Sequence, residues 1–170
     1  FDPTNFPTAS TLKTDANLGR LNITTTLGDT DGDGDFDALY SLGARSFSVW
    51  DANTGAQVFD SKNELDKKAA DLTIYDDGRS DDKGVEPESI TIGRVGNKTI
   101  AVVGMERADA FAIYDITIPT APVFVKMYKT GDAPEGVLFI SASKSPINQS
   151  LIVISSENDG LVKIYKTTKL

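Results

Sequence analysis

Nine residues in the N-terminal part of the chain carry the strongest chemical pattern in the sequence. Residues 29–37 read Asp-Thr-Asp-Gly-Asp-Gly-Asp-Phe-Asp, so that a carboxylate stands at every second position. Carboxylates at this spacing repel one another unless a cation lies between them. The order Asp-x-Asp-x-Asp-Gly-x-x-Asp is that of the first part of a calcium-binding loop. The pattern therefore predicts a Ca²⁺ site.

In such a loop each position has a fixed role. Positions 1, 3, 5 and 9 supply side-chain oxygens, position 7 a backbone carbonyl, and position 6 a glycine for the sharp turn. Position 12, the bidentate Glu of an EF-hand, is Tyr40 here, and no second paired loop follows. The loop instead resembles those of dockerin, thrombospondin type 3 and integrin-propeller modules. The alternative is a solvated Asp/Gly turn without a metal. The expected ligands are Asp29, Asp31, Asp33 and Asp37 through side chains and Asp35 through its carbonyl.

Composition excludes several classes of active site. The chain has 170 residues with no Cys and no His, so it contains neither a Ser-His-Asp triad nor a thiolate or histidine metal site. A net charge of −8 argues against nucleic acid and anionic membranes as partners. No apolar run approaches the roughly 20 residues that span a bilayer, so we expect no membrane insertion. The start, residues 1–3, lacks the features of a signal peptide, as expected for a processed chain or an excised piece.

The apolar segments are short and rich in β-branched residues. Each is bounded by Gly, Pro, Asn, Asp or Ser, which is typical of strands separated by turns. Residues 62–72 read as a charged helix with a weak apolar stripe. Residues 75–84 read as a polar loop between strands, the alternative being a linker between domains. The clearest strand segments are 89–92, 99–103, 110–114, 137–140, 151–154 and 161–165.

An internal repeat groups these strands into larger units. Residues 86–92 align with 133–139 at an offset of 47, and residues 100–107 align with 151–158 at an offset of 51. A partial third copy lies upstream, at 44–51. Units of about 45 residues with four strands are typical of β-propeller blades. We therefore predict an all-β chain with about three four-stranded blades, over residues 12–60, 85–128 and 131–169.

Six segments carry a further pattern: Pro-Glu-Gly-Val at 134–137, Gly-Met-Glu-Arg at 104–107, Ile-Tyr-Asp-Ile-Thr-x-Pro at 113–119, Ser-Ser-Glu-Asn-Asp-Gly at 155–160, the Asp-rich loop from 27 to 37, and Gly-Ala-Arg-Ser-Phe at 43–47. Together they resemble the choice-of-anchor I family. The resemblance extends from Leu12 to Lys169. Members of this family are secreted or surface-anchored bacterial β-propellers, similar to the mesenchyme-specific cell-surface glycoprotein of sea urchins, and some carry an alkaline-phosphatase-like label.

This resemblance implies a propeller of about seven blades, of which the chain would be the C-terminal part. The implied partners are the remaining blades, from the same precursor or another chain, and an extracellular protein or glycan ligand. The implied function is that of a secreted or cell-surface, calcium-binding, non-catalytic scaffold, adhesion or binding module. The alternative is a metal-dependent phosphoric-ester or ester hydrolase. The residues favour the non-catalytic interpretation, because no nucleophile is visibly paired with a base.

Five glutamates recur at corresponding corners of the repeat. Propeller blades place equivalent residues in rings, so these carboxylates predict a cation or ligand site at the mouth of the channel. In a second, structural interpretation each glutamate bonds backbone N–H groups or one of Arg45, Arg94 and Arg107. The sequence leaves both interpretations open. The glutamates are Glu86, Glu88 and Glu135 at strand starts, and Glu106 and Glu157 at strand ends.

Three Asn-x-Ser/Thr triplets begin at Asn22, Asn97 and Asn148. This triplet is the acceptor motif for N-linked glycosylation. The second and third triplets lie in expected loops between strands, where a glycan has room. Because so short a motif also arises by chance, modification and coincidence both remain open.

Overall fold

The chain folds into two compact units. The computed structural model describes residues 1–43 and 45–167. Ala44, which belongs to the expected repeat segment 44–51, and residues 168–170, two of which belong to the expected unit 131–169, lie outside the described residues. The first unit comprises residues 1–43 and 77–84, and the second comprises residues 45–76 and 85–167.

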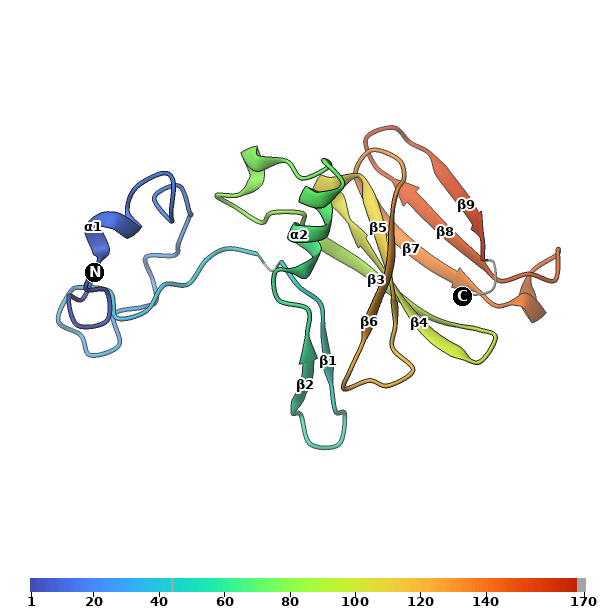
Figure 1. The fold of residues 1–170 in the computed structure, drawn as a ribbon, viewed down its shortest axis with the longest axis horizontal. Coiled ribbons are helices and arrows are strands. Elements are labelled where there is room, and N and C mark those ends of the chain that lie inside the picture. Colours follow the sequence, from blue (N-terminus) through green and yellow to red (C-terminus); the bar gives the residue numbers. More distant parts are fainter. Residues whose placement is uncertain (44, 168–170) are drawn as a thin grey trace. The chain divides into compact units, whose positions relative to one another are not determined.

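The second unit contains three antiparallel sheets in its described part (Figure 1). A hairpin of β1 (Ser48–Trp50) and β2 (Gln57–Asp60) comes first. Two larger sheets follow, and in each the strands pair in chain order as an up-and-down meander. The expected all-β class is thus confirmed, and every expected strand segment overlaps a strand. These strands are β3 (Pro87–Val95), β4 (Lys98–Met105), β5 (Ala110–Asp115) and β6 (Val123–Lys129), then β7 (Pro134–Ile140), β8 (Leu151–Ser156) and β9 (Val162–Lys166).

The number of strands differs from the expected blades. Residues 12–60, expected to form four strands, contain only β1 and β2 in their described part. Residues 12–43 are rich in Thr, Asn, Asp and Gly and lack the alternating β-branched pattern that a sheet needs. The last expected blade has three strands within residues 131–167 in place of four. Residues 77–84, with the 3₁₀ turn η1 (Asp77–Arg79), belong to the first unit.

The two larger sheets share the same irregularity at their first strand. The register of β3 against β4 shifts between Pro87 and Ser89, and that of β7 against β8 shifts between Pro134 and Gly136. In both sheets the residue before the proline has a left-handed φ of 55°. The carbonyl of that residue accepts a bond from the N–H that follows the second strand, at 3.0 Å in one sheet and 2.8 Å in the other. Glu88 and Glu135 therefore occupy corresponding bulges, one in each sheet.

The β3–β6 sheet has a core on each of its faces. One face, with Val103 and Tyr114, packs on α2 (Glu64–Asp71) through Leu65. Tyr114 donates a hydrogen bond to Glu64 Oε2 at 3.0 Å, and burial together with that carboxylate raises the pKa of the tyrosine. The opposite face packs on the β7–β9 sheet. The buried side chains of this second core are Ile100, Val102, Phe111, Ile113, Ile152 and Ile154.

The first unit is built differently. All the buried hydrophobic side chains of the described residues belong to the second unit. In the first unit, the short helix α1 (Ala9–Leu12) buries no side chain. Polar contacts join residues 77–84 to the rest of the first unit: Arg20 contacts Asp77 at 3.0 Å, and Asn22 Nδ2 donates to Asp82 Oδ1 at 2.8 Å. Apolar burial therefore does not account for the order of this unit.

Candidate metal centre

The Asp-rich loop is shaped by its glycines and by its own carboxylates. Gly32 and Gly34 have φ values of 82° and 97°, which L-residues with side chains rarely adopt. Asp29 accepts the N–H groups of both glycines, at 2.7 and 3.0 Å. The N–H of Asp33 donates to Asp31 Oδ1 at 3.3 Å, which is the local bonding typical of Asx turns. The chain is thereby wound so that alternate carboxylates turn toward a common point.

Three of the five predicted ligands lie together. Asp29, Asp31 and Asp33 are exposed, and each offers a carboxylate oxygen within 4.8 Å of the others. This group corresponds to positions 1, 3 and 5 of the expected loop. An open hollow of about 380 Å³ lies against Asp29 and Asp35. The arrangement leaves room for a cation together with water ligands.

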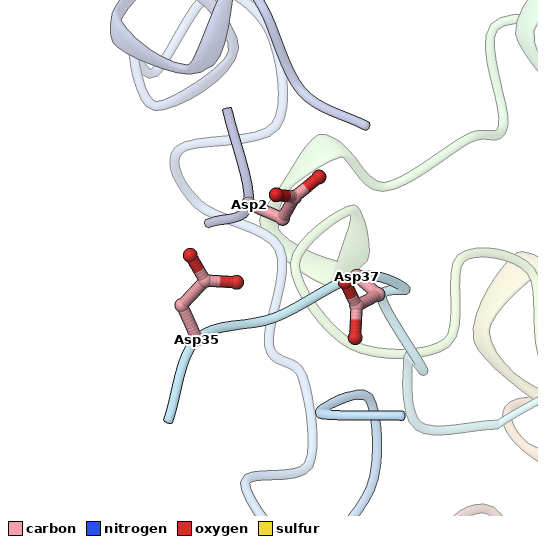
Figure 2. A group of neighbouring side chains, drawn as sticks. All are labelled: Asp2, Asp35 and Asp37. Atoms are coloured by element: carbon pink, nitrogen blue, oxygen red, sulfur yellow. The ribbon is translucent and has the colours of Figure 1, made fainter. Parts of the chain in front are cut away.

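The other two predicted ligands lie in a separate group with Asp2. Figure 2 shows Asp2, Asp35 and Asp37, whose nearest carboxylate oxygens lie within 4.8 Å of one another and which are all partly buried. Asp2 belongs to the N-terminal segment, and its N–H donates to the carbonyl of Phe36 at 2.9 Å. Sequence reasoning missed Asp2, because no spacing rule links it to the loop.

The two loop carboxylates of this second group are in different states. Asp37 Oδ2 accepts both the N–H and the hydroxyl of Thr30, each at 2.8 Å, and these bonds lower the pKa of Asp37. Asp35 Oδ1 is buried without a hydrogen-bond partner among the described residues. Burial raises the pKa of Asp35, and the nearby carboxylates of Asp33 and Asp2 raise it further. A cation at this position would satisfy the buried oxygen.

The donor set of both groups fits calcium. The side-chain ligand atoms of both groups are all carboxylate oxygens, which hard cations prefer. Tyr40, at the position of the EF-hand glutamate, is 48% exposed and offers no bidentate carboxylate. A cation held here would therefore have fewer protein ligands than in an EF-hand and would keep more water.

The five recurring glutamates converge in the second unit. They form two overlapping groups, each with ligand atoms within 4.8 Å, and Glu106 belongs to both. Glu106 is 6% exposed; burial raises its pKa, Arg107 opposes this, and Glu86, Glu88 and Glu135 add to the rise. The groups are Glu86, Glu88 and Glu106, and Glu106, Glu135 and Glu157.

Arg107 supports the structural interpretation of these glutamates. Its Nε lies 3.0 Å from Glu86 Oε2, and its Nη2 lies 2.8 Å from Glu106 Oε1. Arg45 is also an expected partner of the glutamates. Its Nη1 lies 3.3 Å from Asp66 Oδ2. Arg107 thus neutralises part of the acidic charge, while Glu135 and Glu157 remain exposed beside Glu106.

Comparisons with known proteins agree with the sequence motifs. A family model described as "Choice-of-anchor I domain" matches residues 1–119. The chain is 30% identical over 185 residues to Gigasin-3a of Magallana gigas, covering 89% of this chain and 65% of that protein. The chain thus spans less than two thirds of the length of this relative. No solved structure matches the chain significantly. Within the described residues, no helix has the length and apolar character needed to cross a membrane.

Proposed function

The chain belongs to the choice-of-anchor I family of surface-associated domains, and on this premise we propose that it is part of an extracellular β-propeller. The proposed propeller binds calcium and serves as a non-catalytic scaffold or binding module. The observation that carries the calcium proposal is the convergence of Asp29, Asp31 and Asp33 in a unit without buried apolar side chains. The proposed ion is Ca²⁺, held by carboxylates of the 29–37 loop.

The energetics of the first unit support a bound cation. A compact unit of this size without an apolar core usually depends on disulfides, a metal or association with other parts of the protein. The chain has no cysteine and so no disulfide, and a bound metal is the contribution that we propose. An ion that binds only the ordered loop would stabilise it by mass action, by about 2.7 kcal/mol at a free concentration of 100 times Kd. Calcium would also remove the repulsion among the five aspartates.

Hydrogen exchange in the first unit tests the calcium proposal directly. Amide exchange of residues 20–43 would be followed by mass spectrometry in millimolar calcium and in EGTA. We expect slower exchange in calcium, and loss of this protection in Asp31→Asn, which keeps the shape of the side chain but removes its charge. Asp15→Asn, an exposed change outside both aspartate groups, is the matched control. Equal exchange with and without calcium in the unaltered chain would refute the proposal.

We also propose that the β3–β6 and β7–β9 sheets are consecutive propeller blades. Support comes from their common strand order and from the corresponding bulges at Glu88 and Glu135, one in each sheet. Phe111 and Val162 stand at the same repeat offset of 51, yet Phe111 is 1% exposed and Val162 is 64% exposed. The face of β3–β6 that packs on β7–β9 thus has an uncovered counterpart on β7–β9. We propose that a further blade, from the same precursor or another chain, covers it.

The alternative of a metal-dependent hydrolase is favoured by one observation, the two carboxylate groups that share Glu106. A cation held there would activate water for attack on a phosphoric ester or ester. The test is turnover of p-nitrophenyl phosphate and simple esters with calcium, magnesium, manganese or zinc. We expect no turnover by this chain. Turnover that disappears in Glu135→Gln would replace the scaffold proposal with the hydrolase.

A further inference from the structure

We propose that Asn97 is an N-linked glycosylation site and that the first sugar of the glycan rests in a hollow beside it. The inference rests on the extracellular location proposed above, since the transfer takes place in a secretory compartment. It concerns the second unit and is independent of calcium binding.

Asn97 is presented to solvent by a rigid turn. It stands with Gly96 in the two-residue connection between β3 and β4 (Figure 1). Gly96 has a φ of 62°, as the first position of a tight hairpin turn demands. Asn97 is exposed, and its side-chain amide forms no hydrogen bond with another described residue. A substituent on Nδ2 would therefore displace nothing.

Each of the other two triplets has one residue that is less accessible in the folded chain. Asn22 Nδ2 points at Asp82 Oδ1, 2.8 Å away, so a sugar on this nitrogen would crowd the contact. Asn148 has a left-handed φ of 55°, and Ser150, the third residue of its triplet, is buried with its hydroxyl accepting the N–H of Ala142. The structure thus distinguishes Asn97 from Asn148, which the sequence places alike in loops between strands.

The surface next to Asn97 suits a sugar. A hollow of about 270 Å³ opens beside the asparagine. Its lining includes Ile118 and Val123, which are 63% and 61% exposed, and Lys98, which pairs with Asp115 at 3.0 Å. A pyranose ring has an apolar face and a rim of hydroxyls, which match an apolar wall beside charged hydrogen-bonding groups. A sugar in this hollow would also cover two exposed apolar side chains.

The modification is a group transfer. Asn97 Nδ2 forms a bond to C1 of the first sugar of a diphosphate-linked oligosaccharide donor. The bond from C1 to the diphosphate oxygen breaks, and the diphosphate leaves with the bonding electrons. The amide loses one proton to a base of the transferring enzyme, and no atom is oxidised or reduced. Thr99 completes the acceptor triplet.

Secretion of the full 170-residue chain from a eukaryotic host tests the site. The purified chain would be treated with peptide N-glycosidase in ¹⁸O-water, which marks each asparagine that carried a glycan. We expect the mark at Asn97 in most molecules, its loss in Asn97→Gln and Thr99→Ala, and its retention in Thr99→Ser. A secreted, folded chain with unmarked Asn97, including one marked only at Asn22 or Asn148, would overturn the inference. Because no calcium is varied, this result is separate from the calcium proposal.

The resting place of the sugar has its own test. Enzymatic removal of the glycan is expected to lower the Tm of the second unit by about 2 °C, the shift that about 1 kcal/mol produces in a chain of this length. In Ile118→Ser, which opens the apolar wall, removal is expected to lower the Tm by less. An equal shift in the two proteins would show that the glycan does not occupy the hollow.

Discussion

The ring of Phe139 in β7 lies directly over Gly93 in β3. A β-carbon on residue 93 would approach three atoms of this ring to 2.3–2.4 Å. No real contact is that short, so the glycine is required by the close approach of the two sheets. The β3–β6 and β7–β9 sheets can pack as they do only because one side chain is missing at this point.

Gly93→Ala is therefore expected to destabilise the second unit. The added methyl group must push the ring of Phe139 or separate the sheets, and overpacking of this kind costs about 1–3 kcal/mol. The free energy of unfolding would be measured by urea titration. Ile92→Ala is the control: Ile92 is the neighbouring residue, is 61% exposed on the opposite face, and is expected to change stability by less than about 0.5 kcal/mol. Equal effects of the two changes would contradict this packing.

Ile113→Ala and Ile164→Ala form a matched pair at corresponding positions of the repeat. Ile113 is 8% exposed beneath the β7–β9 sheet, whereas Ile164 is 63% exposed on the uncovered face. We expect a loss of about 2–4 kcal/mol for the first change and less than about 0.5 kcal/mol for the second in this chain. If a further blade covers Ile164 in a longer protein, the second loss should there approach the first. Similar losses in the isolated chain would argue against the uncovered face.

Arg107→Met is expected to destabilise the second unit by about 1–3 kcal/mol at neutral pH. The change removes the charge that pairs with Glu86 and Glu106, which are 3% and 6% exposed; the arginine itself is 37% exposed, which reduces the cost. The pKa of Glu106 is already raised, and protonation removes its need for a cation, so the loss should shrink toward about pH 4. Arg94→Met, at an exposed arginine, is the control. A loss that does not depend on pH would point to packing rather than charge.

The decrease in the free energy of unfolding at acidic pH should depend on Asp115. Hydrogen bonds from the hydroxyl and N–H of Thr117, with Lys98 contributing, lower the pKa of Asp115 to about 2. Because the folded pKa lies below the unfolded value, this stabilisation is present above about pH 4 and is lost as the pH falls toward 2. Unfolding free energy measured against pH should fall less steeply in Asp115→Asn. Thr117→Val, which removes only the hydroxyl donor, should give an intermediate slope, and an unchanged slope in Asp115→Asn would contradict the assignment.

Local features were accessible from the sequence. Runs such as 99–103 and 151–154 predict strands because β-branched side chains favour extended backbone and the bounding residues favour turns. The winding of the Asp-rich loop follows from Gly32, Gly34 and the bonds that neighbouring carboxylates make to nearby N–H groups. The alignment of Glu88 with Glu135 predicted equivalent positions in the repeat, and the two residues lie at corresponding bulges in the two sheets. All of these depend on residues close together in the chain.

Which residues meet was decided by the tertiary structure. Asp2 joins Asp35 and Asp37 only because the N-terminal segment bonds to the backbone of the loop, and no periodicity announces such a contact. Val102 and Val153 correspond in the repeat and look alike in sequence, yet one is fully buried and the other is not, because only the first has a sheet packed over it. Local sequence determined the strands, the turns and the candidate ligands of this protein. Burial, ion pairing and the grouping of the carboxylates depend on contacts between distant segments, whose free energy arises only when those segments pack.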